Sequence, residues 1–145
     1  MNSRVVIQSF DWRALKAVQA LAPKIPTGYL SAQQRFLDNI ARGPSGDSAW
    51  TAGVQFSDHG SIPKMVKAAG GAIWSPYFPE LSPELVKQAQ QLGLQVIPWT
   101  VNKREDMARL IDWGVDGLIT DRPDHLREVM AEKKLPLPKA TPVSP

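Results

Sequence analysis

The chain has 145 residues, of which 43% are hydrophobic and 21% charged, with a formal net charge of +3 and no cysteine. This length suits one domain, and the composition is ordinary for a globular protein. The absence of cysteine excludes disulfides and thiolate metal sites. No stretch approaches the roughly 20 apolar residues of a membrane span, so we expect none. Lys and Arg are spread along the chain rather than clustered, which argues against a nucleic-acid partner.

The amino terminus carries no visible targeting signal. The opening residues MNSRVVIQSF lack a charged region followed by a long apolar core, as a secretory signal would have. A cytoplasmic location is then the default, and a periplasmic one stays open for a full-length form. A cysteine-free chain suits either a reducing or an oxidising compartment.

The first part of the chain predicts two strand–helix pairs. Val5–Ser9 is short and apolar enough to be a strand buried on both faces. Asp11 can cap the helix that follows, and Pro23 ends it. Thr27–Leu30 predicts the second strand, and the apolar spacing over residues 31–42 predicts a second helix.

A long loop is predicted over residues 43–60. Gly, Pro, Ser and Asp are dense there, and Trp50 and Phe56 are its isolated aromatics. A loop of this length in a compact domain is usually functional or disordered. We therefore expect a mobile excursion at one rim of the fold.

The middle of the chain returns to regular structure. A short helix is predicted from Ser61 to Gly70, followed by a third strand at Ala72–Ser75. Ser82, with Pro and Glu after it, is a strong helix opening. Gly93 ends that helix.

Residues 96–120 carry the densest set of structural signals in the chain. Val96–Trp99 predicts a fourth strand and Gly117–Thr120 a fifth, with short links to the helix between them. Asn102 and Glu105 have the spacing of a capping box that opens this helix, and Gly114 closes it. Parallel strands joined by helices place their polar residues at the carboxyl ends, where α/β folds bind ligands.

A last helix is predicted from Pro123, and the proline-rich residues 135–145 form an extended, mobile tail. The domain is then residues 1–134. About five strands alternating with helices predict an α/β fold, a partial TIM-type (β/α) barrel. A closed barrel of this type needs eight strands, three more than the five predicted here.

Several of these segments resemble one known family. The residues WTVN at 99–102 and GVDGLITDRP at 114–123 are similar to the closing segment of the glycerophosphodiester phosphodiesterase family. The residues QSFD at 8–11 resemble a mid-barrel strand of that family, and AIWSPY at 72–77 falls where a later strand belongs. The resemblance runs in order over about residues 5–126. It implies a TIM barrel that hydrolyses glycerophosphodiesters to an alcohol and glycerol 3-phosphate. It also implies that this chain is the carboxyl-terminal part of the barrel, with the amino-terminal strands missing.

The catalytic motifs of that family do not occur in this sequence. They are a His-Arg-Gly strand, a Glu-x-Asp metal pair, a second His, and a Glu beside a Lys; the two histidines present, His59 and His125, have no matching context. By resemblance, carboxylates of the complete enzyme hold a divalent metal (Ca or Mg), and two histidines act as acid and base. We therefore expect no catalytic residue and no metal site here, and no activity of the chain alone.

The resemblance implies that Trp99 lines the substrate pocket near the glycerol group. Ser9 and Phe10 occupy the equivalent end of the first strand, and Tyr77 is a candidate for the pocket wall. The mild positive charge could attract the anionic phosphodiester. Ordinary packing is the alternative for each residue, because aromatic residues at strand ends are also common in cores.

Other polar residues have simpler interpretations. Asn102 could reach a ligand, but the capping box explains it fully. Asp121 resembles the family's terminal Thr-Asp pair and also suits a helix cap. His59 beside Asp58 offers too few ligands for a secure metal site, and His125 is expected to face solvent.

The rival interpretation is a non-catalytic half-barrel that binds or assembles, or a remnant of the enzyme. A five-strand arc has open edges at Val5–Ser9 and Gly117–Thr120, and it leaves inward residues such as Val6, Ile73 and Ile97 without an opposing wall. We therefore expect self-association, or pairing with an upstream barrel segment. The head group that is cleaved and the identity of the metal stay open.

Overall fold

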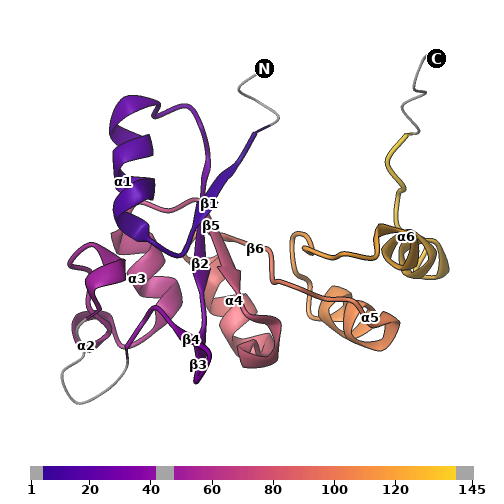
Figure 1. Cartoon of the computed structure of the whole chain (residues 1–145). Helices are drawn as coiled ribbons and strands as arrows, with labels where there is room; N and C mark the ends of the chain where they lie inside the picture. Colours follow the sequence, from indigo (N-terminus) through magenta and orange to yellow (C-terminus); the bar gives the residue numbers. More distant parts are fainter. Residues whose placement is uncertain (1–4, 42–47, 140–145) are drawn as a thin grey trace.

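A parallel sheet organises the computed structural model, which describes residues 5–41 and 48–139. Its four strands run in the order β1-β2-β5-β6, and each neighbouring pair is parallel. Their bounds are Ile7–Ser9 (β1), Thr27–Ser31 (β2), Ile73–Pro76 (β5) and Gln95–Val96 (β6). The predicted α/β class, with strands and helices alternating along the chain, is confirmed (Figure 1).

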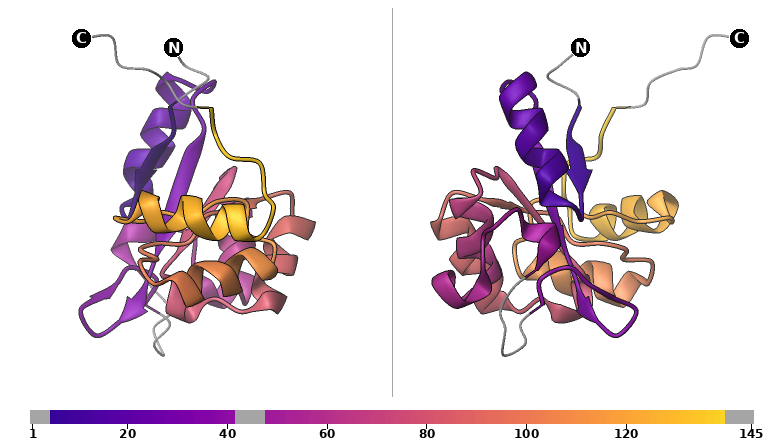
Figure 2. Two further views of the ribbon diagram at one scale, coloured as in Figure 1. Left: turned by 90° about the vertical axis from the view of Figure 1, so that its right-hand side faces the viewer. Right: turned by 60° about the vertical axis from the view of Figure 1, so that its left-hand side comes forward.

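The main helices connect the strands and pack beside them (Figure 1). Their bounds are Trp12–Leu21 (α1), Ile62–Ala68 (α3), Pro83–Gln91 (α4), Arg104–Asp112 (α5) and Pro123–Glu132 (α6). Two openings follow the sequence prediction: the Asp11 side chain accepts a hydrogen bond from the amide of Arg13, and that of Ser82 accepts one from the amide of Leu85. Helices α5 and α6 lie side by side beyond β6 (Figure 2).

The core lies between the sheet and helices α1, α3 and α4. Trp12 and Tyr29 are completely buried, with their ring centroids 5.0 Å apart in an edge-to-face contact. The Tyr29 hydroxyl donates a hydrogen bond to the carbonyl of Ala69 at 2.9 Å, which joins β2 to the end of α3. Gly71 makes this approach feasible, because a Cβ there would lie 2.6 Å from Cγ1 of Val66 and 2.8 Å from Cδ2 of Tyr29.

The helix predicted over residues 31–42 is wrong. The chain forms an antiparallel hairpin there, with strands β3 (Gln33–Gln34) and β4 (Leu37–Asp38). The physical reason is Asn39, which is fully buried and bonded at both ends of its side chain. Its Oδ1 accepts from the amide of Ala32, and its Nδ2 donates to the carbonyls of Phe10 and Leu30, each at 3.0 Å. These three bonds, one of them to a residue 29 positions away, outweigh the helical spacing of the apolar residues.

The loop predicted over residues 43–60 contains short helical segments. These are a 3-10 turn η2 (Ala49–Thr51) and a single-turn helix α2 (Phe56–His59), while residues 42–47 fall outside the described part of the chain. The mobility of this loop, the domain limits and the behaviour of the tail stay predictions.

The fifth predicted strand, Gly117–Thr120, is not a regular strand, but it extends the sheet edge. The amide of Ile119 donates to the carbonyl of Pro98 at 3.0 Å, and its carbonyl accepts from the amide of Val101 at 2.9 Å. The prediction that Ile73 lacks cover is wrong: β5 lies between β2 and β6, and Ile73 is buried. Within the described residues, no helix is long and apolar enough to cross a membrane.

Candidate functional site

Three aromatic rings meet at the carboxyl ends of the strands. Because the strands are parallel, Phe10 after β1, Tyr77 after β5 and Trp99 beyond β6 reach the same edge of the sheet. The ring centroids of Phe10 and Trp99 lie 5.3 Å apart, at an interplanar angle of 84°. Those of Tyr77 and Trp99 lie 5.2 Å apart, at 44°. The structure thus brings together the three aromatic residues that the sequence singled out.

Trp99 is held in one orientation. Its Nε1 donates a hydrogen bond to the carbonyl of Ser75 at 2.9 Å. Its amide donates to the carbonyl of Pro76 at 3.1 Å, and its carbonyl accepts from the amide of Phe78 at 3.0 Å. The ring is half-buried, so part of it still faces outward. A fixed, partly exposed aromatic ring can form the wall of a binding pocket.

A cavity of about 210 Å³ opens beside the rings of Phe10 and Trp99, whereas Tyr77 packs against Trp99 and does not line it. It lies at the end of the sheet where β1 and the Trp99 segment finish, and it has apolar walls with a few polar atoms. Its lining residues are Gln8, Phe10, Leu30, Trp99, Thr100 and Ile119. A cavity of this size lies below the range of pockets that take drug-sized ligands, so it suits a smaller molecule.

Ser9 has a local structural role. Its Oγ accepts a hydrogen bond from the amide of Asp11 at 3.0 Å, which shapes the turn into α1. Ser9 does not line the cavity. The structure therefore supports a turn-forming role for Ser9 more directly than contact with a ligand.

Sequence reasoning missed Phe36, which stands at the tip of the β3–β4 hairpin. Its side chain is 68% exposed, and its ring centroid lies 5.7 Å from that of Tyr77. The hairpin is tied down by Glu80, whose Oε1 accepts from the amide of Gln33 at 2.7 Å and from Nε2 of Gln34 at 2.6 Å. No local signal could reveal this position, because Phe36 also fits the helical spacing of the predicted helix.

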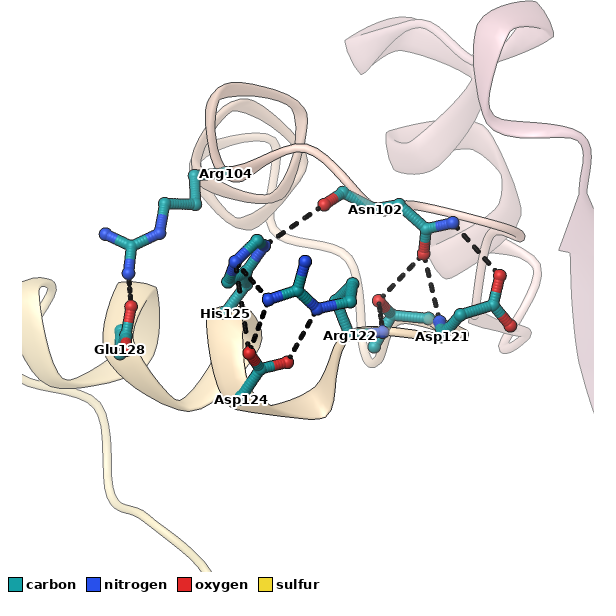
Figure 3. Close-up of polar contacts among 8 residues, drawn as sticks. Asn102, Arg104, Asp121, Arg122, Asp124, His125 and Glu128 are labelled. Atoms are coloured by element: carbon teal, nitrogen blue, oxygen red, sulfur yellow. Dashed lines mark hydrogen bonds and ion pairs between the residues drawn. The ribbon is translucent and has the colours of Figure 1, made fainter.

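Asn102 links the two motif segments that resembled the family (Figure 3). Its Oδ1 accepts hydrogen bonds from the hydroxyl of Thr120 at 3.1 Å and the amide of Asp121 at 2.9 Å. The capping-box interpretation is wrong, because α5 begins after Lys103 and no side chain caps it. Asn102 bonds instead to partners 18 and 19 positions along the chain. Asp121 does not cap α6 either, because the residue before that helix is Arg122.

An ion pair marks the start of α6 (Figure 3). The guanidinium of Arg122 donates to both carboxylate oxygens of Asp124, at 3.0 and 2.6 Å. These bonds hold the pKa of the Asp124 carboxyl far below its usual range. His125 lies against Arg122, with their nitrogens 2.6 Å apart, so it is partly covered rather than facing solvent as predicted. Arg122 is thus engaged locally, which leaves it less suited to hold a phosphate.

The described residues do not fit a metal ion. Among them, no group of three or more His, Cys, Asp or Glu side chains is placed to hold one. His59 and Asp58 lie on the one-turn helix α2. They are adjacent in sequence and gain no third ligand within the described chain.

Comparisons with known proteins agree with this architecture. The model of the glycerophosphoryl diester phosphodiesterase family matches residues 1–125. A glycerophosphodiester phosphodiesterase of Caldanaerobacter subterraneus is 30% identical over 125 residues, which are 86% of this chain and 42% of that protein. One of Bacillus subtilis is 32% identical over 126 residues, 87% of this chain and 36% of that protein.

A crystal structure from Silicibacter pomeroyi, whose assignment as a glycerophosphoryl diester phosphodiesterase is itself provisional, aligns with a TM-score of 0.75 and 37% identity. It covers 93% of this chain and 40% of that one. The chain therefore spans less than half the length of the relatives it matches. The sheet and helices described above correspond to part of the TIM barrel of these proteins. With its family model matched over 125 of 145 residues, the chain belongs to the glycerophosphoryl diester phosphodiesterase family.

Proposed function

We propose that this chain supplies one wall of a glycerophosphodiester-binding pocket and takes part in hydrolysis to an alcohol and glycerol 3-phosphate. The observation that carries the proposal is the cluster of Phe10, Tyr77 and Trp99 beside a cavity at the carboxyl ends of the strands. Barrel enzymes build their active sites at this end. The family to which the chain belongs supports the reaction class.

Within this pocket the aromatic rings act on the glycerol part of the substrate. Trp99, fixed by its hydrogen bond to Ser75, offers a flat apolar wall to the glycerol carbons. Phe10 packs edge-on against Trp99 and keeps its ring in place. The net charge of +3 favours the approach of the anionic phosphodiester.

The proton transfers and the metal chemistry are assigned to other residues. Family resemblance implies a divalent ion such as Ca or Mg, but the described side chains form no cluster that could hold it. Histidine acid and base groups would likewise come from outside the cluster of Phe10, Tyr77 and Trp99. We therefore propose that the chain is inactive by itself and requires a complementary part of the barrel.

Complementation tests this proposal. The chain is mixed with the separately produced amino-terminal remainder of the Caldanaerobacter relative, and release of glycerol 3-phosphate from glycerophosphocholine is measured. We expect turnover in the mixture and none from either part alone. Trp99→Ala in the mixture should raise KM several-fold, while Trp50→Ala, which changes an exposed tryptophan outside the cavity, should not. Turnover by the chain alone would contradict the proposal, as would a stable mixture that stays inactive.

A non-catalytic binding or assembly module is the second candidate. It is favoured by the missing metal cluster in the described chain and by β1, which pairs on one side only among the described strands. Binding of glycerol 3-phosphate to the chain without turnover in any complemented mixture would support this alternative.

A further inference from the structure

A second cavity lies on the helix-facing side of the sheet. We call it the helix-side pocket; it has a volume of about 280 Å³ and shares no lining residue with the cavity beside Trp99. Its polar lining comes from Gln33 on β3, Ser61 before α3 and Glu80 in the 3-10 turn η3 (Phe78–Glu80). Its apolar lining includes Trp74 and Leu85. All of these lining residues belong to the described part of this chain.

Three polar atoms of these lining residues have no hydrogen-bond partner within the described part of the chain. They are Nε2 of Gln33, Oγ of Ser61 and Oε2 of Glu80, and all three are shielded from solvent. Buried polar atoms are nearly always paired, because an unpaired one loses its hydration without replacement. Three such atoms around one cavity indicate that a polar ligand completes them, after small side-chain rotations that bring them to it.

The charge in the helix-side pocket is negative and uncompensated. Oε1 of Glu80 accepts hydrogen bonds only from neutral donors, the amide of Gln33 and the side chain of Gln34. No ion pair of Glu80 occurs among the described residues. Trp74 already donates its Nε1 to Ser31 Oγ at 2.9 Å, so it offers the pocket only an aromatic surface. A carboxylate beside an aromatic wall suits an organic cation.

We propose that the helix-side pocket binds a small primary ammonium compound, such as a short amino alcohol. The ammonium group donates to Oε2 of Glu80 and to Oγ of Ser61. The short carbon body lies against Trp74 and Leu85, and a hydroxyl of the ligand accepts from Nε2 of Gln33. This assignment concerns a site distinct from the proposed phosphodiester pocket and is independent of it.

A ligand series on the unmodified chain tests the chemistry, with NMR shifts of the Ser61 and Glu80 amides and of the Trp74 indole as the readout. The probes are 3-aminopropanol, tetramethylammonium, which has no N–H donor, and the uncharged 1-propanol. We expect saturable shifts at all three residues with 3-aminopropanol. The other two probes should bind at least about tenfold more weakly, since each lacks the charge-assisted hydrogen bond. Shifts that do not saturate, that lie elsewhere, or that 1-propanol reproduces with equal affinity would overturn the proposal.

Variants then test the residues. Glu80→Gln keeps an oxygen that can accept from the amide of Gln33 but removes the charge, and should weaken 3-aminopropanol binding about tenfold or more. Glu84→Gln is the matched control, because Glu84 is exposed and does not line the pocket. Equal affinity in Glu80→Gln and the native chain would overturn the assignment. If that variant fails to fold, Ser61→Ala and the ligand series decide in its place: unchanged affinity in Ser61→Ala refutes the proposed contact.

Discussion

The side chain of Asn102 both accepts a hydrogen bond from the backbone of Asp121 and donates one to its side chain. Oδ1 of Asn102 accepts from the amide of Asp121 at 2.9 Å, while its Nδ2 donates to Oδ2 of the same residue at 3.0 Å. Only a side chain with both a donor and an acceptor can make this pair, so Asn102 suits the position better than Asp or Leu would. The contact fixes the chain between β6 and α5 against the turn that opens α6 (Figure 3).

Removing this contact should loosen the turn before α6. Asn102→Ala deletes three hydrogen bonds in an exposed place, and we expect a loss of about 1 to 2 kcal/mol in the free energy of unfolding. Urea denaturation followed by circular dichroism measures the loss. Lys103→Ala is the control, since Lys103 precedes α5 without a side-chain capping bond and should change stability little. Equal stability of Asn102→Ala and the native chain would mean that the contact contributes nothing.

Substitution of Gly71 tests how tightly the core is packed. Gly71→Ala should destabilise the chain by about 1 to 3 kcal/mol, because the added methyl group would press on Val66 and Tyr29 at less than 3 Å. Gly117→Ala is the matched control: its Cβ would meet Ile97 at 3.5 Å, which is an ordinary contact. Urea midpoints of the two variants should differ clearly. A Gly71→Ala protein as stable as Gly117→Ala would show that the core has more freedom than the structure indicates.

Local sequence signals predicted the elements whose causes are local. The helix openings at Asp11 and Ser82 need only a side chain and an amide two or three residues away, and both are found as predicted. The ring contact between Tyr77 and Trp99 also follows from the sequence, because parallel strands bring their carboxyl ends to one edge of the sheet.

The predictions that were wrong failed because of contacts between residues far apart in the sequence. Residues 31–42 form a hairpin in which Asn39 bonds to Leu30 and to Phe10, and Phe10 lies 29 positions away, outside any local window. Asn102 likewise does not cap the helix as predicted, because its side chain bonds to Asp121 instead. Phe36 was missed as a result of the first error, because a helix would not have placed it beside Tyr77. The spacing of apolar residues indicates whether a segment can form an amphipathic helix. It does not indicate which polar side chain, such as that of Asn39, will bond to a residue far away in the sequence.

Tyr29 should make stability sensitive to alkaline pH. Burial raises the pKa of the Tyr29 hydroxyl, which donates to the carbonyl of Ala69. A raised folded-state pKa means that the stabilisation is complete below the unfolded value of about 10 and is lost as the pH rises through the higher folded value. The advantage of the native chain over Tyr29→Phe in urea midpoint should therefore be constant near neutral pH and shrink above a pH of about 10. The two proteins differ only at residue 29, so an advantage that stays constant through alkaline pH would contradict this account.

The exposed edge of the sheet should govern self-association. Among the described strands, β1 pairs only with β2, and beside it the apolar side chain of Val6 is 48% exposed. An unpaired edge with apolar residues favours contact with another chain, and a lysine there opposes it. We expect the native chain to self-associate in sedimentation velocity and Val6→Lys to shift it towards monomer. Leu21→Lys is the control, because Leu21 is 86% exposed at the end of helix α1 and does not belong to the unpaired strand, so this substitution should leave association unchanged. If the native chain stays a cooperatively folding monomer at high concentration, or if both variants reduce association equally, the open edge is not the cause.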